Sequence, residues 1–319
     1  MVLLLNESEV TSLLTMDDTL PLIEQALRDY GEGNALNYSR YRLMSLNSVL
    51  YVMSANLPRM RSSGLKVYST SKTGARFLVL LLDSESGEWL SIMAANKLGQ
   101  MRTGATSGVA TKYLARKDAR TLGIYGSGWQ ARSQIEAIAK VRNLQAIRCY
   151  SPTKTHSERF AREITASLDI ETTPVAEPKS AAEGVDIIVT VTNTKDPIVR
   201  GEWLQDGVHL NGVGANDLHR RELDSTSISK CDVIFVDSLE QSKLESGDLV
   251  MPVSEGILEW GRVQELGRLV AGKVEGRSTQ DQITLFKSNG LAIEDVAVAR
   301  HVYDLAVSQG VGRTIEFFS

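Results

Sequence analysis

Short apolar runs alternate with stretches of helical periodicity from residue 121 onward. The apolar runs have the length and composition of strands buried on both faces of a sheet. The expected strands are 121–125, 146–150, 171–175, 186–191, 208–213 and 233–236, and the expected helices are 129–140, 155–167, 178–183 and 218–229. This alternation predicts an α/β fold with a Rossmann-type, doubly wound parallel sheet.

The first hundred residues follow a different pattern. Thr15 and Asp18 resemble a capping box opening a helix that reaches about Tyr30, and strand-like segments follow at 39–46, 49–55, 64–69, 76–82 and 89–95. We therefore expect a smaller α+β domain over residues 1–117 and the α/β domain over 118–292. A final helix, in 293–319, is expected to be amphipathic and to pack back on the first domain, with Val296, Ala299, Val302 and Leu305 on its apolar face.

The first strand of the α/β domain ends in a glycine-rich turn, Gly126-Ser127-Gly128-Trp129-Gln130-Ala131, that runs directly into a helix. In dinucleotide-binding proteins this spacing lets Gly126 form the tight turn, Gly128 admit a pyrophosphate and Ala131 pack against the strand. The N–H groups at the start of the helix favour phosphate. An ordinary glycine turn is the alternative, but the strand before it and the helix after it favour a cofactor site.

Ligands of doubly wound sheets bind beyond the carboxyl ends of the strands. The loops after the strands ending near Tyr125, Tyr150, Val191 and Val213 are therefore expected to line the cofactor site. The residues added to the expected cofactor site on this ground are Val191, Thr192 and Val213, with Ser288 and Gly290 after the apolar run 283–286.

The end of the second strand bears on the choice of cofactor. An NAD site usually has Asp or Glu there, which binds the ribose hydroxyls. Here Tyr150 is followed by Ser151-Pro-Thr153-Lys154, which offers hydroxyl and ammonium donors and no acid. These donors suit a 2′-phosphate, so we expect NADP(H) to be favoured over NAD(H). The alternative is that Ser151 and Thr153 only cap the helix that follows.

Composition excludes several classes of function. The net charge is −4 with no basic stripe, so no nucleic-acid partner is expected. Cys149 and Cys231 lie far apart, which fits buried thiols in a reducing compartment, and no Cys/His cluster indicates a metal. No run of about 18 apolar residues predicts a membrane span. We therefore expect a cytoplasmic protein without a membrane partner.

Further motifs extend over nearly the whole chain. They are Leu65-Lys66, Arg102-Thr103-Gly104-Ala105, Val213-Gly214-Ala215, Arg221-Glu222-Leu223-Asp224, Glu245-Ser-Gly-Asp248 and Thr284-Leu-Phe-Lys-Ser288. With the glycine turn, their order and spacing resemble the ornithine cyclodeaminase/μ-crystallin family, which includes alanine dehydrogenases and cyclic ketimine reductases. The resemblance implies a Rossmann domain plus a substrate domain that dimerises through its sheet, and hence a homodimer.

The resemblance also implies a site for the substrate carboxylate, formed by Arg40, Lys66 and Arg102. Arg42, two residues along the same strand, is an alternative to Arg40. Thr103, like Arg102, is expected near the cofactor pyrophosphate. One position departs from the family pattern, because Asn216 stands where cyclodeaminases and alanine dehydrogenases have an aspartate that handles the amino group, and Asp217 comes next. Asn cannot take up a proton at neutral pH, so ornithine cyclisation is less favoured.

These expectations combine into one leading hypothesis. The protein is an NAD(P)H-dependent oxidoreductase that transfers hydride to or from the α-carbon of a small α-imino or α-amino acid. Arg40 and Arg102 hold the carboxylate, Lys66 adds charge and relays the proton, and Asn216 orients the nitrogen. Two alternatives stay open: an ammonia-releasing cyclodeaminase with bound NAD, and a non-catalytic, crystallin-like NADPH-binding protein.

Overall fold

The computed structural model describes residues 1–318, and its internal contacts divide the chain into two compact units. Unit 1 comprises Met1–Thr103 and the segment from Gly290 onward, and unit 2 comprises Gly104–Asn289. The first crossing falls inside helix α3 (Asn96–Leu114), earlier than the Lys117 boundary expected from the sequence. Because α3 continues without a break from one unit into the other, the amino-acid composition does not mark the boundary. The sequence pattern changes only where the helix ends.

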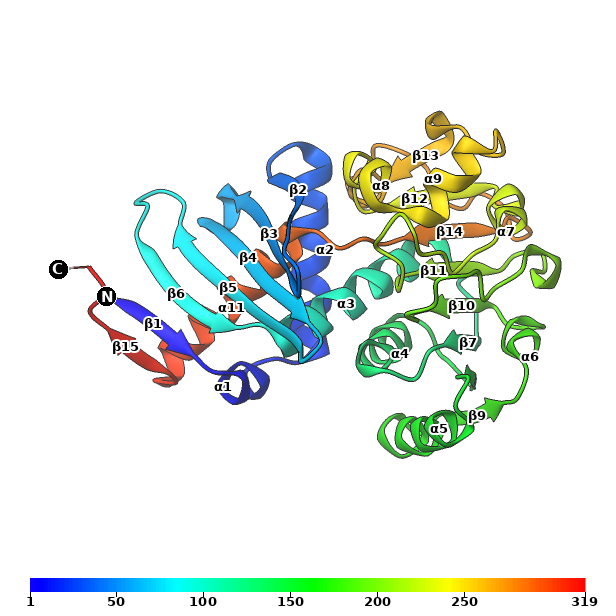
Figure 1. The fold of residues 1–319 in the computed structure, drawn as a ribbon, viewed down its shortest axis with the longest axis horizontal. Coiled ribbons are helices and arrows are strands. Elements are labelled where there is room, and N and C mark those ends of the chain that lie inside the picture. Colours follow the sequence, from blue (N-terminus) through cyan, green and yellow to red (C-terminus); the bar gives the residue numbers. More distant parts are fainter. Residues whose placement is uncertain (319) are drawn as a thin grey trace. The chain divides into compact units, whose positions relative to one another are not determined.

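Unit 2 contains an eight-stranded sheet with the order β13-β12-β14-β11-β10-β7-β8-β9, shown in Figure 1. Every neighbouring pair is parallel. The strands are β7 (Thr121–Tyr125), β8 (Ala146–Tyr150), β9 (Glu171–Val175), β10 (Ile187–Thr190), β11 (His209–Gly212), β12 (Val233–Val236), β13 (Val263–Glu265) and β14 (Thr284–Lys287). The chain order reverses at β7, which lies between β8 and β10. The predicted doubly wound parallel sheet is therefore confirmed, with its switch point beside β7.

The helices of unit 2 are α4 (Trp129–Val141), α5 (Lys154–Leu168), α6 (Pro178–Ala182), α7 (Ser225–Lys230), α8 (Leu239–Glu245), α9 (Gly247–Ser254) and α10 (Leu266–Val270), with short 3-10 turns η2 (Gly201–Trp203) and η3 (Trp260–Arg262). The helix expected over 218–229 is wrong in its first part. Asp224 caps α7 by accepting from the Ser227 N–H at 2.7 Å, so the helix begins at Ser225. The preceding residues are held extended, because Glu222 and Leu223 both donate backbone N–H groups to Asp248.

Unit 1 contains a seven-stranded sheet with the order β15-β1-β6-β5-β4-β3-β2. Its strands are β1 (Val2–Leu5), β2 (Leu36–Met44), β3 (Ser48–Leu57), β4 (Ser62–Ser71), β5 (Gly74–Asp83), β6 (Trp89–Ala94) and β15 (Arg313–Ile315). The five long strands β2–β6 are successively antiparallel, and each was expected within a few residues of its bounds. The sequence pattern missed the short strand β15 and the short helix α1 (Glu7–Ser12), which Asn6 and Glu9 cap reciprocally.

Helices α2 (Met16–Glu32) and α11 (Ala292–Gln309) cover one face of this sheet (Figure 1). Helix α11 packs on β3, β4 and α2. Its expected amphipathic pattern is wrong for its first half, where residues 292–299 are all buried. This helix therefore carries Glu294 and Asp295 into the interior, where each needs a partner.

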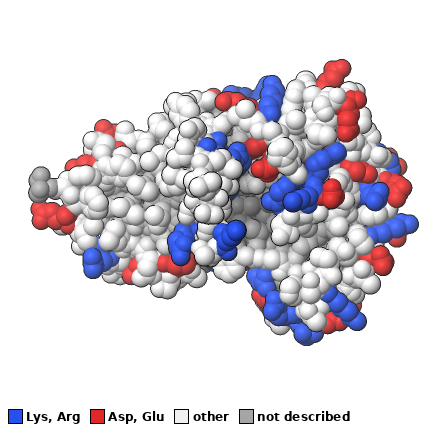
Figure 2. Space-filling model, in the orientation of Figure 1, with Lys and Arg blue, Asp and Glu red and all other residues white. Residues whose placement is uncertain are grey.

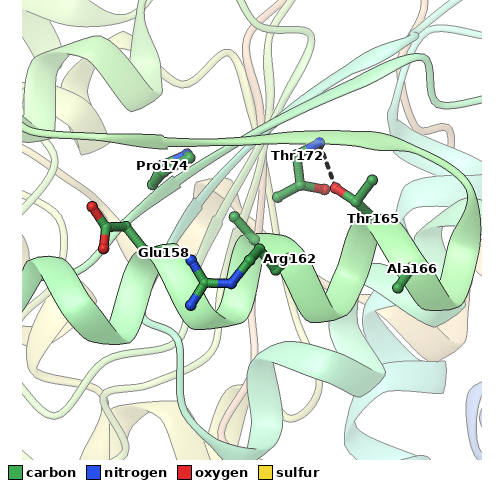
Figure 3. Close-up of a pocket in the computed structure, with 7 residues that line it drawn as sticks. Glu158, Arg162, Thr165, Ala166, Thr172 and Pro174 are labelled. Atoms are coloured by element: carbon green, nitrogen blue, oxygen red, sulfur yellow. Dashed lines mark hydrogen bonds between the residues drawn. The ribbon is translucent and has the colours of Figure 1, made fainter.

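The surface carries both signs of charge. Lys and Arg are interspersed with Asp and Glu over unit 2, while the visible surface over the strands of unit 1 is mostly uncharged (Figure 2). No helix among the described residues is long and apolar enough to cross a membrane. A surface pocket of about 470 Å³ lies between α5 and β9, where the Thr172 N–H donates to the Thr165 hydroxyl (Figure 3). None of the residues expected in the functional site lines it.

Candidate functional site

The glycine-rich turn of unit 2 has the geometry that phosphate binding requires. Gly126 has φ +105°, and a Cβ there would lie 2.5 Å from the Val191 carbonyl oxygen at the end of the neighbouring strand β10. Only glycine fits this tight turn at the switch point. Gly128, by contrast, has nothing within 4 Å of the position a Cβ would take. The turn therefore leaves open space directly before helix α4.

The N-cap residue of α4 is Gly128, which has no side chain to cap the first turn of the helix. Trp129 is about half exposed, and the buried Gln130 side-chain oxygen has no hydrogen-bond partner. Ala131 is fully buried against the sheet, as the motif requires. An open cradle, an uncapped helix N-terminus and an orphaned polar atom together fit a dinucleotide pyrophosphate.

The loop after β8 is exposed and contains no acid, as the sequence shows. Helix α5 begins at Lys154, and its N-cap residue Thr153 makes no side-chain capping bond, which contradicts the alternative that Thr153 serves only to cap the helix. The Lys154 side chain is 88% exposed and lies 3.7 Å from Glu158. Ser151 is half-buried beside it. These donors are thus accessible in the free protein.

The loops after β10 and β11 are held by one buried carboxylate that sequence reasoning gave no role. Glu222 accepts from the Thr192 N–H at 2.6 Å, the Thr192 hydroxyl at 2.7 Å and the Gly214 N–H at 2.6 Å. Burial raises the pKa of Glu222, and the nearby Asp248 adds to this effect. Val191 and Val213 continue from these strand ends, donating backbone N–H groups to Tyr125 and Thr190. Glu222 thus fixes the shape of the loops at the sheet switch point.

Lys287 is a second buried charge that sequence reasoning gave no role. It is fully buried, and its Nζ donates to the carbonyls of Gly212 at 3.1 Å and Ala215 at 2.5 Å, with Asp248 at 3.3 Å. The sequence did contain a signal for this residue, because Lys287 ends the apolar run of β14. A lysine at the end of a buried strand needs several hydrogen-bond acceptors, which indicates a structural or functional role. Ser288, next in the chain, donates its hydroxyl to Asp237 at 3.2 Å.

Unit 1 brings the expected carboxylate-binding residues into one buried cluster on the helix-covered side of the sheet. Lys66 is 3% exposed, and its Nζ donates to Asp295 at 2.8 Å. Arg102 is 7% exposed and contacts Glu294 at 2.5 Å and Asp295 at 3.1 Å. Burial lowers the pKa of Lys66 to about 8, with the Arg102 charge adding to the effect and Asp295 opposing it. For Arg102, burial works against the charged form, but Asp295 and Glu294 outweigh it and raise the pKa.

Arg40 is 8% exposed, and its charge is another of those that lower the pKa of Lys66. Arg42 instead lies over the Tyr51 ring, 5.7 Å from the ring centroid. The structure therefore places Arg40 with Lys66 and Arg102. Gly290 has φ +82°, and a Cβ there would lie 2.6 Å from the Arg102 guanidinium. This residue, expected in the cofactor site, therefore packs directly on Arg102. Thr103 donates its hydroxyl to the Gly99 carbonyl within its own helix.

An aromatic row that sequence reasoning missed lies beside Lys66. Tyr51, Tyr68 and Phe77 are register partners on β3, β4 and β5. The two tyrosine rings stack with centroids 4.2 Å apart, and Phe77 lies 5.1 Å from Tyr68. Since Tyr68 follows Lys66 by two residues, the row shares the face of Lys66, whose Nζ is 5.8 Å from the Tyr68 centroid. The cluster therefore has a row of stacked aromatic rings on one side.

The loop after β11 contains the position that departs from the family pattern. Asn216 and Asp217 are both half-buried. One oxygen of Asp217 accepts from the His219 N–H at 2.9 Å, and its carbonyl accepts from Arg220, so this side chain is engaged in a local turn. Among the described residues, no group of three or more His, Cys, Asp and Glu is placed to hold a metal ion.

A doubly wound sheet with a glycine-rich turn after its first strand, and a buried cluster of cations in unit 1, fit the class of NAD(P)-dependent oxidoreductases. The model of the ornithine cyclodeaminase/mu-crystallin family matches residues 2–310, and the chain belongs to this family.

Its relatives include Δ(1)-pyrroline-2-carboxylate reductase of Bacillus cereus, which is 34% identical over 99% of this chain and 100% of the relative. The structure of Thermococcus litoralis Δ(1)-pyrroline-2-carboxylate reductase in complex with NADH and L-proline is 36% identical, with a TM-score of 0.95 over 98% of this chain and 100% of that chain. An archaeal alanine dehydrogenase dimer with bound NAD has a TM-score of 0.94 and 34% identity over 99% of both chains.

Proposed function

We propose that this protein reduces a cyclic imine carboxylate of the Δ1-pyrroline-2-carboxylate type to the cyclic amino acid. The chain is an NAD(P)-dependent oxidoreductase of imines and amino acids, as its relatives are. The observation that carries the finer proposal is the buried cluster of Lys66, Arg102 and Arg40 beside a row of stacked aromatic rings. The cations suit the carboxylate, and the row offers aromatic surface against which a small cyclic substrate can pack.

The buried charges of this cluster suit an anionic ligand. Lys66, Arg40 and Arg102 are three buried cations, and Glu294 and Asp295 are two buried carboxylates. Among these five side chains the cations outnumber the carboxylates by one, which favours the binding of a substrate carboxylate. Because the cluster is desolvated, each charge-assisted hydrogen bond to that carboxylate is worth about 1.5–3 kcal/mol. The two acidic side chains of the cluster already bind Lys66 and Arg102, so they are poorly placed to receive the second ammonium of a diamino acid.

The reaction adds one hydride to the imine carbon and one proton to the nitrogen. When bound, the reduced nicotinamide supplies the hydride and the electron pair. Within the chain, Lys66 holds a proton at Nζ with a pKa of about 8, close to the working pH, so it is suited to supply a proton to the ring nitrogen. Arg102 and Arg40 hold the carboxylate and thereby orient the carbon that accepts hydride.

The proposal is tested by mixing the purified protein with Δ1-pyrroline-2-carboxylate and NADH or NADPH, and following nicotinamide absorbance and proline formation together. Stoichiometric consumption and product are expected. Two other activities serve as comparisons: ammonia release from ornithine without net nicotinamide change, and reductive amination of pyruvate. Higher kcat/KM in either of these than with the cyclic imine would overturn the proposed substrate, while no turnover with any would favour a cofactor-binding role alone.

We further propose NADP(H) as the preferred cofactor, because Ser151, Thr153 and Lys154 offer donors and no acid. Replacing Ser151 with Asp should reverse the preference, since a carboxylate would repel a 2′-phosphate and bind ribose hydroxyls. Dissociation constants of both cofactors, measured by nicotinamide fluorescence, check this expectation. Equal affinities of the wild type for NADH and NADPH would contradict it.

A homodimer is the third part of the proposal. The sheet face opposite α2 and α11 exposes Tyr41, Leu43, Leu50 and Leu78 by 38–63%. Tyr41, Val52, Val67 and Leu78 are successive register partners across β2–β5, so they form one apolar row on that face. A contiguous exposed apolar row of this kind is typical of a protein–protein interface. The same face of a second copy of this chain would bury it in a symmetric dimer.

Replacing Leu78 with Lys should weaken this dimer, because the charge would have to be buried in the interface. The measurement is molar mass by analytical ultracentrifugation over a concentration series. Val307→Lys is the matched control, because Val307 is 58% exposed near the end of α11 and lies off the sheet. A monomeric wild type, or equal dimer weakening by both variants, would contradict the proposed interface.

A further inference from the structure

Two consecutive acidic residues stand in the first turn of α11, and both are fully buried. Glu294 contacts Arg102 at 2.5 Å. Asp295 contacts Arg102 at 3.1 Å and is also hydrogen-bonded to the Nζ of Lys66 at 2.8 Å. The two carboxylates thus differ in their contact with Lys66, since the hydrogen bond from its Nζ is accepted by Asp295.

The surroundings of Lys66 explain why this carboxylate is needed. Arg102 from α3 and Arg40 from β2 both act on the ammonium with positive charge. The rings of Tyr68 and Phe77, from β4 and β5, lie 5.8 and 5.7 Å from Nζ, and Asp295 faces it from α11. Asp295 is therefore the carboxylate in direct contact with the ammonium, where it opposes the effects of burial and of the two guanidinium groups on the pKa of Lys66.

We propose that Asp295 is the positioning residue for Lys66: it fixes the ammonium beside the substrate site and keeps it protonated in the neutral pH range. Glu294 acts on Arg102 instead and orients the guanidinium for the substrate carboxylate. The inference rests on the proposed function for the direction of the reaction, and on the contacts of α11 for the assignment of the two carboxylates.

The sign of the expected pH effect follows from these charges. The pKa of Lys66 is about 8, lowered by burial first and by Arg102 next, with Asp295 pulling it upward. Imine reduction needs the protonated amine, so activity is present below this pKa and is lost as the pH rises through it. Removing the carboxylate charge removes the upward pull, so the loss of activity should occur at lower pH.

The experiment compares Asp295→Asn with Glu294→Gln. For Asp295→Asn, the alkaline limb of the kcat profile should move down by about one unit or more, the usual effect of one close charge. Activity at pH 8 should then fall at least about fivefold, because the protonated fraction of Lys66 drops from about one half to about one eleventh, with a smaller loss near pH 6. Glu294→Gln should raise KM and leave the alkaline limb in place. Equal shifts in both variants, or no shift in Asp295→Asn, would overturn the assignment.

A second measurement does not depend on the substrate. The Nζ and Cε resonances of Lys66, assigned by their absence in Lys66→Met, should titrate near pH 8 in the wild type and lower in Asp295→Asn. If no imine is reduced but this titration shifts, the proposed substrate fails while the role of Asp295 stands. Should Asp295→Asn unfold, the double variant Lys66→Met/Asp295→Asn should regain stability, because it removes both partners of the buried pair. Absence of that recovery would overturn the pairing.

Discussion

Replacing Lys66 with methionine is expected to abolish most of the reductase activity while leaving NAD(P)H affinity within about threefold of the wild type, since a loss confined to the chemical step leaves ground-state binding of the cofactor unchanged. The loss of a charge-assisted bond to the substrate carboxylate costs about 1.5–3 kcal/mol, which is roughly a tenfold to hundredfold fall in kcat/KM. Loss of the proton donor adds a fall in kcat of about 10²–10⁴. Methionine keeps the buried volume, and Asp295 keeps its contact with Arg102 at 3.1 Å, so the fold should survive.

The measurements are steady-state kinetics with the cyclic imine and a fluorescence titration with the cofactor. Lys72→Met, at an exposed position in the turn between β4 and β5, makes the same chemical change outside the cluster and should retain full activity. Unchanged kcat/KM in Lys66→Met would remove this residue from the site and with it the proposed mechanism.

Replacing Gly128 with valine should raise the dissociation constant for NAD(P)H by at least about 100-fold, because branched Cβ substituents would occupy the space through which the pyrophosphate approaches the backbone. The fold should be indifferent to this change. A Cβ at Gly128 meets nothing within 4 Å, and its φ of −81° is allowed for valine. Isothermal titration with NADH and NADPH, together with thermal unfolding, separates binding from stability.

Gly261→Val is the matched control for this prediction. Gly261 lies in the turn η3, and a Cβ there also meets nothing within 4 Å. It should therefore keep both stability and cofactor affinity. Retained affinity in Gly128→Val would show that the pyrophosphate binds elsewhere, whereas equal losses in both variants would show a general effect of surface valines.

The parallel sheet of unit 2 could be predicted closely because its strands are short, apolar and buried on both faces. The helix expected over 218–229 was wrong in its first part because of a hydrogen bond between residues far apart in the sequence. Residues before Ser225 have helical periodicity, but Asp248 binds the backbone of Glu222 and Leu223 and holds it extended. Local pattern cannot report a hydrogen bond from a residue so far along the chain.

The buried cluster around Lys66 shows the same limit of prediction from local sequence. Lys66 and Arg102 were proposed as site residues from the resemblance to the family, and the structure brings them together around Asp295. Their partners were not identified, because Asp295 is 229 residues from Lys66 and lies in a helix expected to show one polar face. In a helix whose first half is buried on all sides, acidic side chains are tolerated only where basic side chains pair with them. The tertiary contacts, rather than the periodicity, decide which face is buried.

Unit 1 is built from two stretches of chain separated by the whole of unit 2. During synthesis the contiguous unit 2 leaves the ribosome before the last strand and helix of unit 1 exist, so it is able to fold first. Until α11 emerges, Lys66 and Arg102 lack the two carboxylates that compensate the cost of burying their charges. The order of translation thus makes the buried cluster of Lys66 and Arg102 one of the last parts of the molecule able to form, and a chain that ends before α11 cannot assemble it.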